Sequence, residues 1–171
     1  NKGVYNAPMM VTKIEDKYGN VLANFYPESR EVITENTAFL MANLLQGVVD
    51  EGTGRRLRFR YGFKNQIGGK TGTTQNHSDG WFIGITPDLA GGVWVGAEDR
   101  SIHFQNLANG QGASMALPIW ALFMQKVYAD KSLAVPQSDF QKPNGVNHVL
   151  DCGDADREGM TDYDSSDEIF D

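Results

Sequence analysis

The sequence has few of the residues from which disulfides, metal sites and membrane spans are built. Its single cysteine, Cys152, excludes a disulfide within the chain, and we expect this thiol to be incidental, with pairing to a cysteine outside these 171 residues as the alternative. The histidines, His77, His103 and His148, lie far apart and show no metal-ligand spacing, so we predict neither a metal nor a cofactor. No apolar run approaches the roughly 20 residues that span a bilayer, and no charged-then-apolar leader opens the chain. We therefore expect no membrane segment here and place any export signal or anchor outside this piece.

Most of the chain also lacks excess charge. The net charge is -7, but residues 151–171 hold nine acidic residues against Arg157, so residues 1–150 carry 13 acidic and 14 basic residues and a net charge of +1. This balance gives no reason to expect a nucleic-acid partner or a cation store. With 40% hydrophobic and 11% aromatic residues, the chain has the composition of one globular domain. Periodicity is lost after Pro136, and the acidic stretch 151–171 is typical of solvated or disordered chain.

Glycine and hydroxyl residues are concentrated in one stretch, Gly68-Gly69-Lys70-Thr71-Gly72-Thr73-Thr74. Glycine allows another backbone to come close, while the lysine and the threonines supply charge and hydrogen-bond donors. We predict a strand from about residue 66 to 74 with Lys70, Gly72 and Thr74 on one face and Thr71 and Thr73 on the other. Such a strand at a cleft can present its edge to a ligand.

A phosphate-binding loop is the nearest rival interpretation, because Gly69-Lys70-Thr71 matches the end of the G-x-x-x-x-G-K-[ST] pattern. That pattern requires glycine at position 64, where this chain has Lys64, and Gly62 lies two residues too early. Glycine and threonine follow instead of an amphipathic helix, so we disfavour this interpretation.

The segments before the glycine-rich strand have local signals of a scaffold. Residues 9–25 predict a hairpin around the turn 16–20, where Gly19 and Asn20 can take positive φ. Thr34 can cap a helix that Gly52 and Gly54 end. The buried face of this helix is expected to contain Ala38, Met41, Leu44, Leu45, Val48 and Val49.

Basic residues then crowd the connection to the glycine-rich strand: Arg55, Arg56, Arg58, Arg60 and Lys64. Two interpretations remain open. They form a solvated loop, or they help to attract an anionic ligand.

Beyond the glycine-rich strand we expect a turn over residues 75–80, strands over 81–86 and 92–97, a polar loop over 98–111 and a helix over 114–129. Trp81, Phe82, Val93 and Trp94 are predicted to lie in the core. The helix is apolar nearly all round, which predicts that it lies against the sheet and is covered elsewhere too; Pro118 is tolerable only near its first turn. Asp79 is expected to cap the turn, with a catalytic role as the alternative.

The succession Lys70-Thr71-Gly72-Thr73-Thr74, a short polar loop and Asp79-Gly80-Trp81-Phe82-Ile83-Gly84 resembles the third active-site motif and following strand of the penicillin-binding proteins, most closely those of class A. Further landmarks follow the same order: Asn1-Lys2-Gly3, Ala7-Pro8, Glu51-Gly52-Thr53-Gly54 and Gly92-Val93-Trp94-Val95-Gly96. The resemblance covers roughly residues 1–130. It implies an α+β fold, an antiparallel sheet with flanking helices, of which this chain supplies most of the sheet and the last helix and leaves one sheet face unfilled.

The sequence departs from the family at the nucleophile. None of its serines is followed by lysine three residues on or by asparagine two residues on, so the Ser-x-x-Lys and Ser-x-Asn motifs are both missing. The resemblance therefore implies the C-terminal portion of a transpeptidase domain over residues 1–135, inactive alone, followed by an acidic extension over 136–171. Two alternatives stay open: part of a related carboxypeptidase or β-lactamase-like enzyme, or a non-catalytic module that binds a peptide or partner.

The resemblance also implies roles for the motif residues in a serine acyl-transfer reaction between peptidoglycan stem peptides. Lys70 would supply positive potential and help to set the protonation of the nucleophilic serine and its lysine, and the backbone N–H of Thr73 would be one oxyanion donor. The hydroxyls of Thr71 and Thr73 would bind the substrate's terminal carboxylate, Gly72 would leave room for the substrate, and Thr74 would also belong to the substrate-binding residues. The implied partners are stem peptides ending in D-Ala-D-Ala, β-lactams and the missing N-terminal part of the domain. The parent enzyme would work outside the cytoplasmic membrane, anchored to it, and would carry a glycosyltransferase domain.

Overall fold

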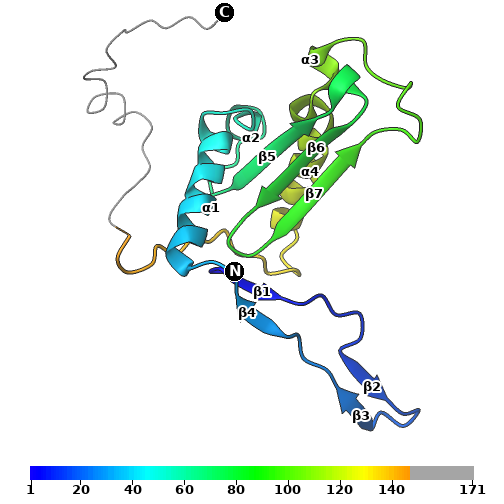
Figure 1. Cartoon of the computed structure of the whole chain (residues 1–171), viewed down its shortest axis with the longest axis vertical. Helices are drawn as coiled ribbons and strands as arrows, with labels where there is room; N and C mark the ends of the chain where they lie inside the picture. The colour runs from blue at the N-terminus through cyan, green and yellow to red at the C-terminus, as the bar shows by residue number, and fades with distance from the viewer. Residues whose placement is uncertain (147–171) are drawn as a thin grey trace, which may run out of the picture.

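A three-stranded antiparallel sheet forms the centre of the protein. The computed structural model describes residues 1–146. The strands are β5 (Gly68–Thr73), β6 (Gly80–Ile85) and β7 (Ala90–Val95), in the order β5-β6-β7. The long C-terminal helix α4 (Gly112–Ala129) lies behind this sheet in Figure 1. This arrangement agrees with the expected α+β fold, and the three strands lie within two residues of their predicted limits.

The hydrophobic core lies between the sheet and α4. Phe82 on β6 and Trp120 on α4 are buried, and their rings meet edge to face with centroids 5.4 Å apart. Gly84 leaves the space that Trp120 fills, because a Cβ at this position would come within 2.5 Å of the indole. Val49, Leu57, Ile67 and Leu117 belong to the same buried cluster. Each fully buried large apolar side chain contributes roughly 1.5–3 kcal/mol to folding, so this layer carries most of the stability of the sheet.

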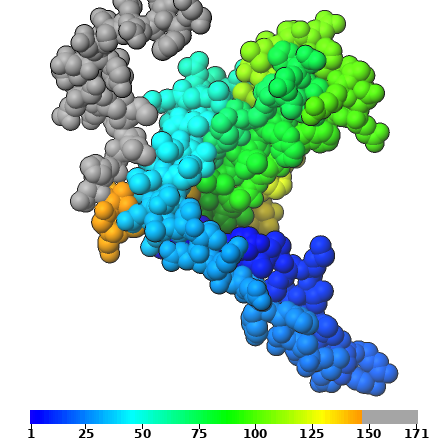
Figure 2. Space-filling model, in the orientation of Figure 1, coloured from blue at the N-terminus to red at the C-terminus, as the bar shows by residue number. Residues whose placement is uncertain are grey.

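The opposite face of the sheet is largely uncovered. Cross-strand register places Lys70 opposite Ile83, Gly72 opposite Trp81, and Trp81 opposite Trp94. We call these five residues the open face. Trp81, Ile83 and Trp94 are 45%, 51% and 48% exposed, and the green atoms of residues 68–95 lie at the surface in Figure 2.

The prediction that Trp81 and Trp94 lie in the core is therefore wrong, whereas Phe82 is buried as predicted. Strand alternation sorts these residues correctly onto two faces, but α4 covers only one of the faces. The unfilled sheet face that the resemblance implied is the face on which the two tryptophans lie.

Helix α1 (Glu35–Asp50) lies against β5 and begins and ends where the sequence predicts. The Thr34 hydroxyl accepts a hydrogen bond from the Thr37 N–H, which caps the helix. At the other end, a Cβ at Gly52 would come within 2.9 Å of the Val48 backbone, so glycine permits the tight exit. The predicted buried face is only partly correct, because Val49 is buried but Met41 and Leu44 are exposed. A short helix, α2 (Arg56–Phe59), follows within the basic connection, for which a solvated loop was one of the two interpretations.

The N-terminal 31 residues contain two pairs of short strands. β2 (Lys13–Glu15) and β3 (Val21–Asn24) form the predicted hairpin, with positive φ at Gly19 only. β1 (Val4–Asn6) pairs with β4 (Ser29–Glu31), a pairing that the sequence did not indicate. Figure 1 shows the β2–β3 hairpin extending away from the sheet and α4.

The loops contain two further short elements, η1 (Gln75–His77) in the turn after β5 and α3 (Leu107–Gly110) before α4. Pro118 is the seventh residue of α4, and the outer side of this helix exposes Ile119, Leu122 and Phe123. The prediction that α4 is covered on all sides is thus wrong within the described residues. No helix among residues 1–146 has the length and apolar character to cross a membrane.

After α4 the chain returns to the sheet. The Phe140 N–H donates to the Gln66 side chain, and the Ser138 hydroxyl donates to Asp88. The start of the segment 136–171 thus contacts the folded part. Cys152, His148 and the acidic stretch lie outside the described residues.

Candidate active site

The glycine-rich motif forms β5, whose outer side has no strand partner among the described residues. Gly69 fits close to the sheet, since a Cβ there would come within 2.8 Å of the Phe82 ring. Lys70 and Gly72 lie on the open face beside Ile83 and Trp81, as the predicted alternation requires. The exposed Lys70 ammonium donates to the Thr71 carbonyl at 2.7 Å, so its charge stays beside the strand edge.

The backbone N–H of Thr73 points to the free edge of β5. The neighbouring Thr74 N–H donates inward, to the Asp79 carbonyl at 3.1 Å, which extends the β5–β6 ladder by one residue. Successive residues of a strand direct their N–H groups to opposite sides. The Thr73 N–H is therefore available to a ligand that lies along this edge.

The Thr73 side chain contacts the first turn of α4. Its Oγ1 accepts a hydrogen bond from the Gly112 N–H at 3.0 Å. Among the hydrogen bonds of the described residues, none uses the Thr73 hydroxyl proton. Thr73 is exposed at the end of β5, so this proton can be donated to a ligand.

The other two motif hydroxyls have partners within the protein. Thr71 Oγ1 lies 2.8 Å from Thr53 Oγ1, which joins β5 to the connection between α1 and α2. Thr74 Oγ1 accepts from the Asp79 N–H at 3.0 Å and lies 3.0 Å from the Ser78 hydroxyl. Of these three hydroxyls, Thr73 is thus the one whose oxygen accepts from a backbone N–H of α4 and whose proton has no acceptor among the described residues.

Asp79 joins the turn after β5 to the far strand of the sheet. Its carboxylate accepts from the Thr74 and Ser78 hydroxyls, both at 3.1 Å, and from the Trp94 indole N–H at 3.2 Å. Arg100 lies 3.8 Å away. Burial raises the pKa of Asp79, but the bonds from Ser78, Thr74 and Trp94 and the Arg100 charge outweigh it, so the pKa lies below its ordinary value of 3.8. Asp79 therefore holds the turn, as predicted.

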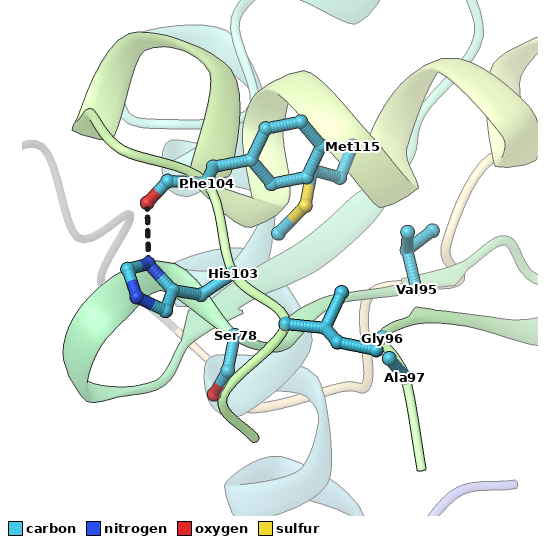
Figure 3. A pocket seen from close by; sticks show the side chains of 8 residues that line it. Ser78, Val95, Gly96, Ala97, His103, Phe104 and Met115 are labelled. Carbon is cyan, nitrogen blue, oxygen red and sulfur yellow. Dashed lines mark hydrogen bonds between the residues drawn. The ribbon is translucent and has the colours of Figure 1, made fainter. Parts of the chain in front are cut away.

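A small cavity of about 260 Å³ lies beside this turn. Figure 3 shows Val95, Phe104 and Met115 among its lining residues, with the His103 ring turned back to the Phe104 carbonyl at 3.0 Å. The lining is mostly apolar and includes no carboxylate, lysine or arginine. This cavity does not suit the charged end of a peptide.

The basic cluster has a structural role that neither sequence-based interpretation anticipated. Arg56 donates to the Ala113 carbonyl at 2.9 Å and to the Ser114 hydroxyl at 2.8 Å, in the first turn of α4. Arg58 pairs with Asp50 and donates to the carbonyls of Phe63 and Asn65. Arg55, Arg60 and Lys64 are exposed, so the interpretation as a ligand-attracting patch now concerns these three residues.

Within residues 1–146, no group of three His, Cys, Asp or Glu side chains is placed to hold a metal ion. His77 and His103 lie on the turn and loop near the cavity. Sequence reasoning did not single out Thr53 or Gly112, which contact Thr71 and Thr73.

Comparisons with a family model and with individual known proteins identify the same family. The family described as "Penicillin binding protein transpeptidase domain" matches residues 1–114. Penicillin-binding protein 1A of Aquifex aeolicus is 34% identical over 143 residues, 84% of this chain and 18% of the relative. The protein of the same name from Pseudomonas aeruginosa is 36% identical over 125 residues, 71% of this chain and 14% of the relative. The chain thus spans less than a fifth of the length of these relatives.

The fold is also shared with a solved structure. The 2.6 Å crystal structure of penicillin-binding protein 1A from Haemophilus influenzae matches with a TM-score of 0.69 at 23% identity, over 83% of this chain and 26% of that one. The sequence match covers the helix α1, the motif strand β5 and the sheet that presents it. The chain belongs to the family of the penicillin-binding protein transpeptidase domain.

Proposed function

We propose that this chain supplies the substrate-binding strand of a peptidoglycan D,D-transpeptidase, with the end of a stem peptide lying along the free edge of β5. One observation carries the proposal. The Thr73 N–H, the unused proton of its hydroxyl and the Lys70 ammonium are arranged along one open strand edge. An acyl-transfer site needs donors for an oxyanion, donors for a terminal carboxylate and positive potential, and these groups supply one of each.

Each motif residue has a role in this proposal. The Thr73 N–H stabilises the oxyanion and its hydroxyl binds the carboxylate of the terminal D-alanine. Lys70 supplies positive potential, and Gly72 leaves the strand edge free of a side chain. Thr71, whose hydroxyl is held by Thr53, adds a second hydroxyl near the carboxylate. Because the Thr74 hydroxyl is bonded within the turn, Thr74 contributes by fixing the end of the strand.

The nucleophile in this proposal comes from another part of the protein, because no serine of the chain stands in a Ser-x-x-Lys motif. A serine activated near Lys70 has to approach the sheet face that Lys70 occupies. That face also exposes Trp81, Ile83 and Trp94, an apolar surface suited to packing under another element. The proposed partners are therefore the N-terminal part of the domain, stem peptides ending in D-Ala-D-Ala, and β-lactams.

In the proposed reaction the serine oxygen attacks the carbonyl of the penultimate D-alanine, and the serine's proton passes to the departing amine of the terminal D-alanine. An amine of a neighbouring peptidoglycan strand then attacks the acyl-enzyme ester and takes the acyl group, while its proton returns to the released serine oxygen. The site of action is outside the cytoplasmic membrane, in a parent protein anchored there that also carries a glycosyltransferase domain. A non-catalytic peptide-binding module is the second candidate, and the missing nucleophile motif favours it.

Substituting Gly72→Val in the intact parent enzyme tests the placement of the substrate. The new side chain projects from the open face beside Trp81, whose Cβ would lie 3.2 Å from a Cβ at residue 72. We expect acylation by benzylpenicillin to slow about 100-fold or more, because a displacement of about 1 Å of a bound group has that effect.

Gly92→Val is the matched control for this substitution. Gly92 lies on the same sheet face but on β7, and a Cβ there meets nothing closer than 3.6 Å. We expect acylation of the folded variant within about twofold of the parent, because β7 is separated from the proposed substrate edge of β5 by the whole of β6. Unchanged acylation of a folded Gly72→Val enzyme would refute the placement of the substrate along β5.

A further inference from the structure

We propose that Gly112, the first residue of α4, is a positioning residue for carboxylate recognition. In this proposal its N–H holds the Thr73 hydroxyl as a hydrogen-bond donor, and its missing side chain lets α4 reach the motif strand. The inference rests on the proposed function and adds to it a residue 39 positions away from Thr73 in the sequence.

The first turn of α4 lacks a cap of its own. Gln111 precedes the helix and makes no side-chain capping bond, although the Ser114 and Met115 N–H groups donate to its carbonyl. A helix leaves its first N–H groups without partners inside the helix. The Gly112 N–H finds Thr73 Oγ1 at 3.0 Å, so Thr73 caps α4 from the neighbouring strand.

This bond determines what the Thr73 hydroxyl can do. The Gly112 N–H occupies an acceptor position of Oγ1, which directs the remaining hydroxyl proton away from the helix and toward the exposed side. A hydroxyl that accepts from one group becomes a stronger donor to the next. The positive end of the helix dipole lies at the same place and favours an anion there.

Glycine is required at position 112 because the helix end lies directly on the sheet backbone. A Cβ on Gly112 would lie far inside the van der Waals distance of both the Gly72 carbonyl oxygen and the Trp81 carbonyl oxygen. Both oxygens belong to paired residues of β5 and β6, so neither can move aside without disturbing the sheet. Gly80 also allows this close contact, since a Cβ added at residue 80 would lie 3.2 Å from the Gly112 Cα.

The first turn of α4 is also held on another side. Arg56 bonds the Ala113 carbonyl and the Ser114 hydroxyl, the two residues that follow Gly112. The Ser114 hydroxyl donates to the Ala108 carbonyl at 2.7 Å, which joins this turn to α3. These bonds fix the helix end against β5 and keep it from fraying.

The test is a double-mutant cycle in the intact parent enzyme between Gly112→Ala and Thr73→Val, measured as the rate of acylation by benzylpenicillin. Gly112→Ala pushes the helix end away from Thr73, and we expect it to slow acylation about tenfold, the effect of losing one hydrogen bond to a charged group. On the Thr73→Val background the same substitution should change the rate by less than about twofold. On a Thr73→Ser background, which keeps the hydroxyl, the tenfold loss should persist.

Two controls separate positioning from general destabilisation. Gly47→Ala adds a methyl group to α1 in open space, and we expect an unchanged acylation rate. The methyl ester of benzylpenicillin lacks the carboxylate, so the Gly112→Ala variant and the parent should react with it at equal rates. An equal loss with the acid and the ester, or an equal loss with and without the Thr73 hydroxyl, would overturn the proposal.

A second measurement applies if Gly112→Ala fails to fold. Because Thr73 caps α4, Thr73→Val should lower the melting temperature of the transpeptidase domain by a few degrees while Thr73→Ser preserves it. An unchanged melting temperature for Thr73→Val would show that the cap contributes nothing. If Thr73→Val leaves penicillin acylation unaffected, the proposed function of Thr73 fails instead, and that result is distinguishable from failure of the Gly112 proposal.

Discussion

At the scale of single residues, the site depends on where each polar group directs its hydrogen bonds. Thr71 and Thr74 have partners within the protein, while Thr73 is held by Gly112 and keeps a proton for a ligand. The Lys70 ammonium donates to the Thr71 carbonyl of its own strand. These differences give neighbouring residues of one motif separate roles.

Lys70→Ala in the parent enzyme should separate chemistry from folding. We expect acylation by benzylpenicillin to fall about 10²–10⁴-fold, the usual contribution of a group that sets proton transfer. In the 171-residue chain the same substitution should leave the melting temperature within about two degrees, because the exposed Lys70 side chain hydrogen-bonds no group of the described residues other than the Thr71 carbonyl. Lys17→Ala, which changes an exposed lysine in the turn of the β2–β3 hairpin, is the control and should retain full acylation. A Lys70→Ala enzyme with normal acylation would remove Lys70 from the mechanism.

Asp79→Asn should change the acid sensitivity of the fold. The pKa of Asp79 is lowered in the folded state, so its ionised form stabilises the protein at pH values above the ordinary value of 3.8. This stabilisation is lost as the pH falls below that value and through the lower folded pKa. The protein with Asp79 should therefore be more stable than the Asn variant at pH 7, and this difference in the free energy of unfolding should shrink below about pH 4. Urea denaturation at a series of pH values measures this difference, and a difference independent of pH would contradict the assignment.

At the scale of secondary-structure elements, the α4 side of the sheet is the stabilising layer and the open face is not. Trp120 is buried against Phe82 and Phe63, whereas Ile119, the preceding residue on the same helix, is half exposed. Neighbouring positions of one helix thus differ strongly in their contribution to folding.

Trp120→Ala should lower the free energy of unfolding by about 3–5 kcal/mol, the cost of deleting a large buried aromatic side chain. Ile119→Ala should cost less than about 1 kcal/mol in the 171-residue chain, because this side chain is half exposed. Urea denaturation followed by far-ultraviolet circular dichroism measures both. Equal losses for the two variants would mean that α4 is oriented differently.

Much of the element pattern could be predicted from the sequence because its signals are local. The Thr34 cap, the Gly52 exit and the hairpin turn at Gly19 each depend on residues a few positions apart. The β1–β4 pairing could not be predicted, since each strand has three residues and the pairing depends on tertiary contacts. Nor does alternation say which face of a sheet is covered, which explains the error at Trp81 and Trp94.

The candidate site, too, could be predicted from the sequence only in part. The motif residues Lys70, Thr71, Gly72 and Thr73 were identified by resemblance, and their faces by alternation. The contacts that differentiate them, Thr53 with Thr71 and Gly112 with Thr73, join residues 18 and 39 positions apart. Only the fold brings such pairs together, so no local signal in the sequence could select Thr53 or Gly112.

At the scale of the whole molecule, the chain combines a packed sheet-and-helix layer with an uncovered apolar face beside its site. Trp81, Ile83 and Trp94 expose about half of their surface next to Lys70. In our account this face packs under the part of the parent protein that carries the nucleophile.

Ile83→Ala tests this packing by comparing two forms of the protein. In the 171-residue chain the substitution should change the free energy of unfolding by less than about 1 kcal/mol, because Ile83 is half exposed there. In the intact parent it should cost about 2–4 kcal/mol, the loss expected at a buried position. Thermal and urea denaturation measure both, and equally small losses in the two forms would mean that the open face stays uncovered.

The most direct test of the central claim is labelling with a fluorescent penicillin followed by intact-mass analysis. It would be applied to this chain alone, to the upstream part of the parent alone, and to the two mixed. We predict that this chain stays unlabelled and that the upstream part gains one penicilloyl group only in the mixture, which would make β5 one half of a divided active site. A penicilloyl group on this chain alone would contradict the account, because one of its own serines would then be the nucleophile.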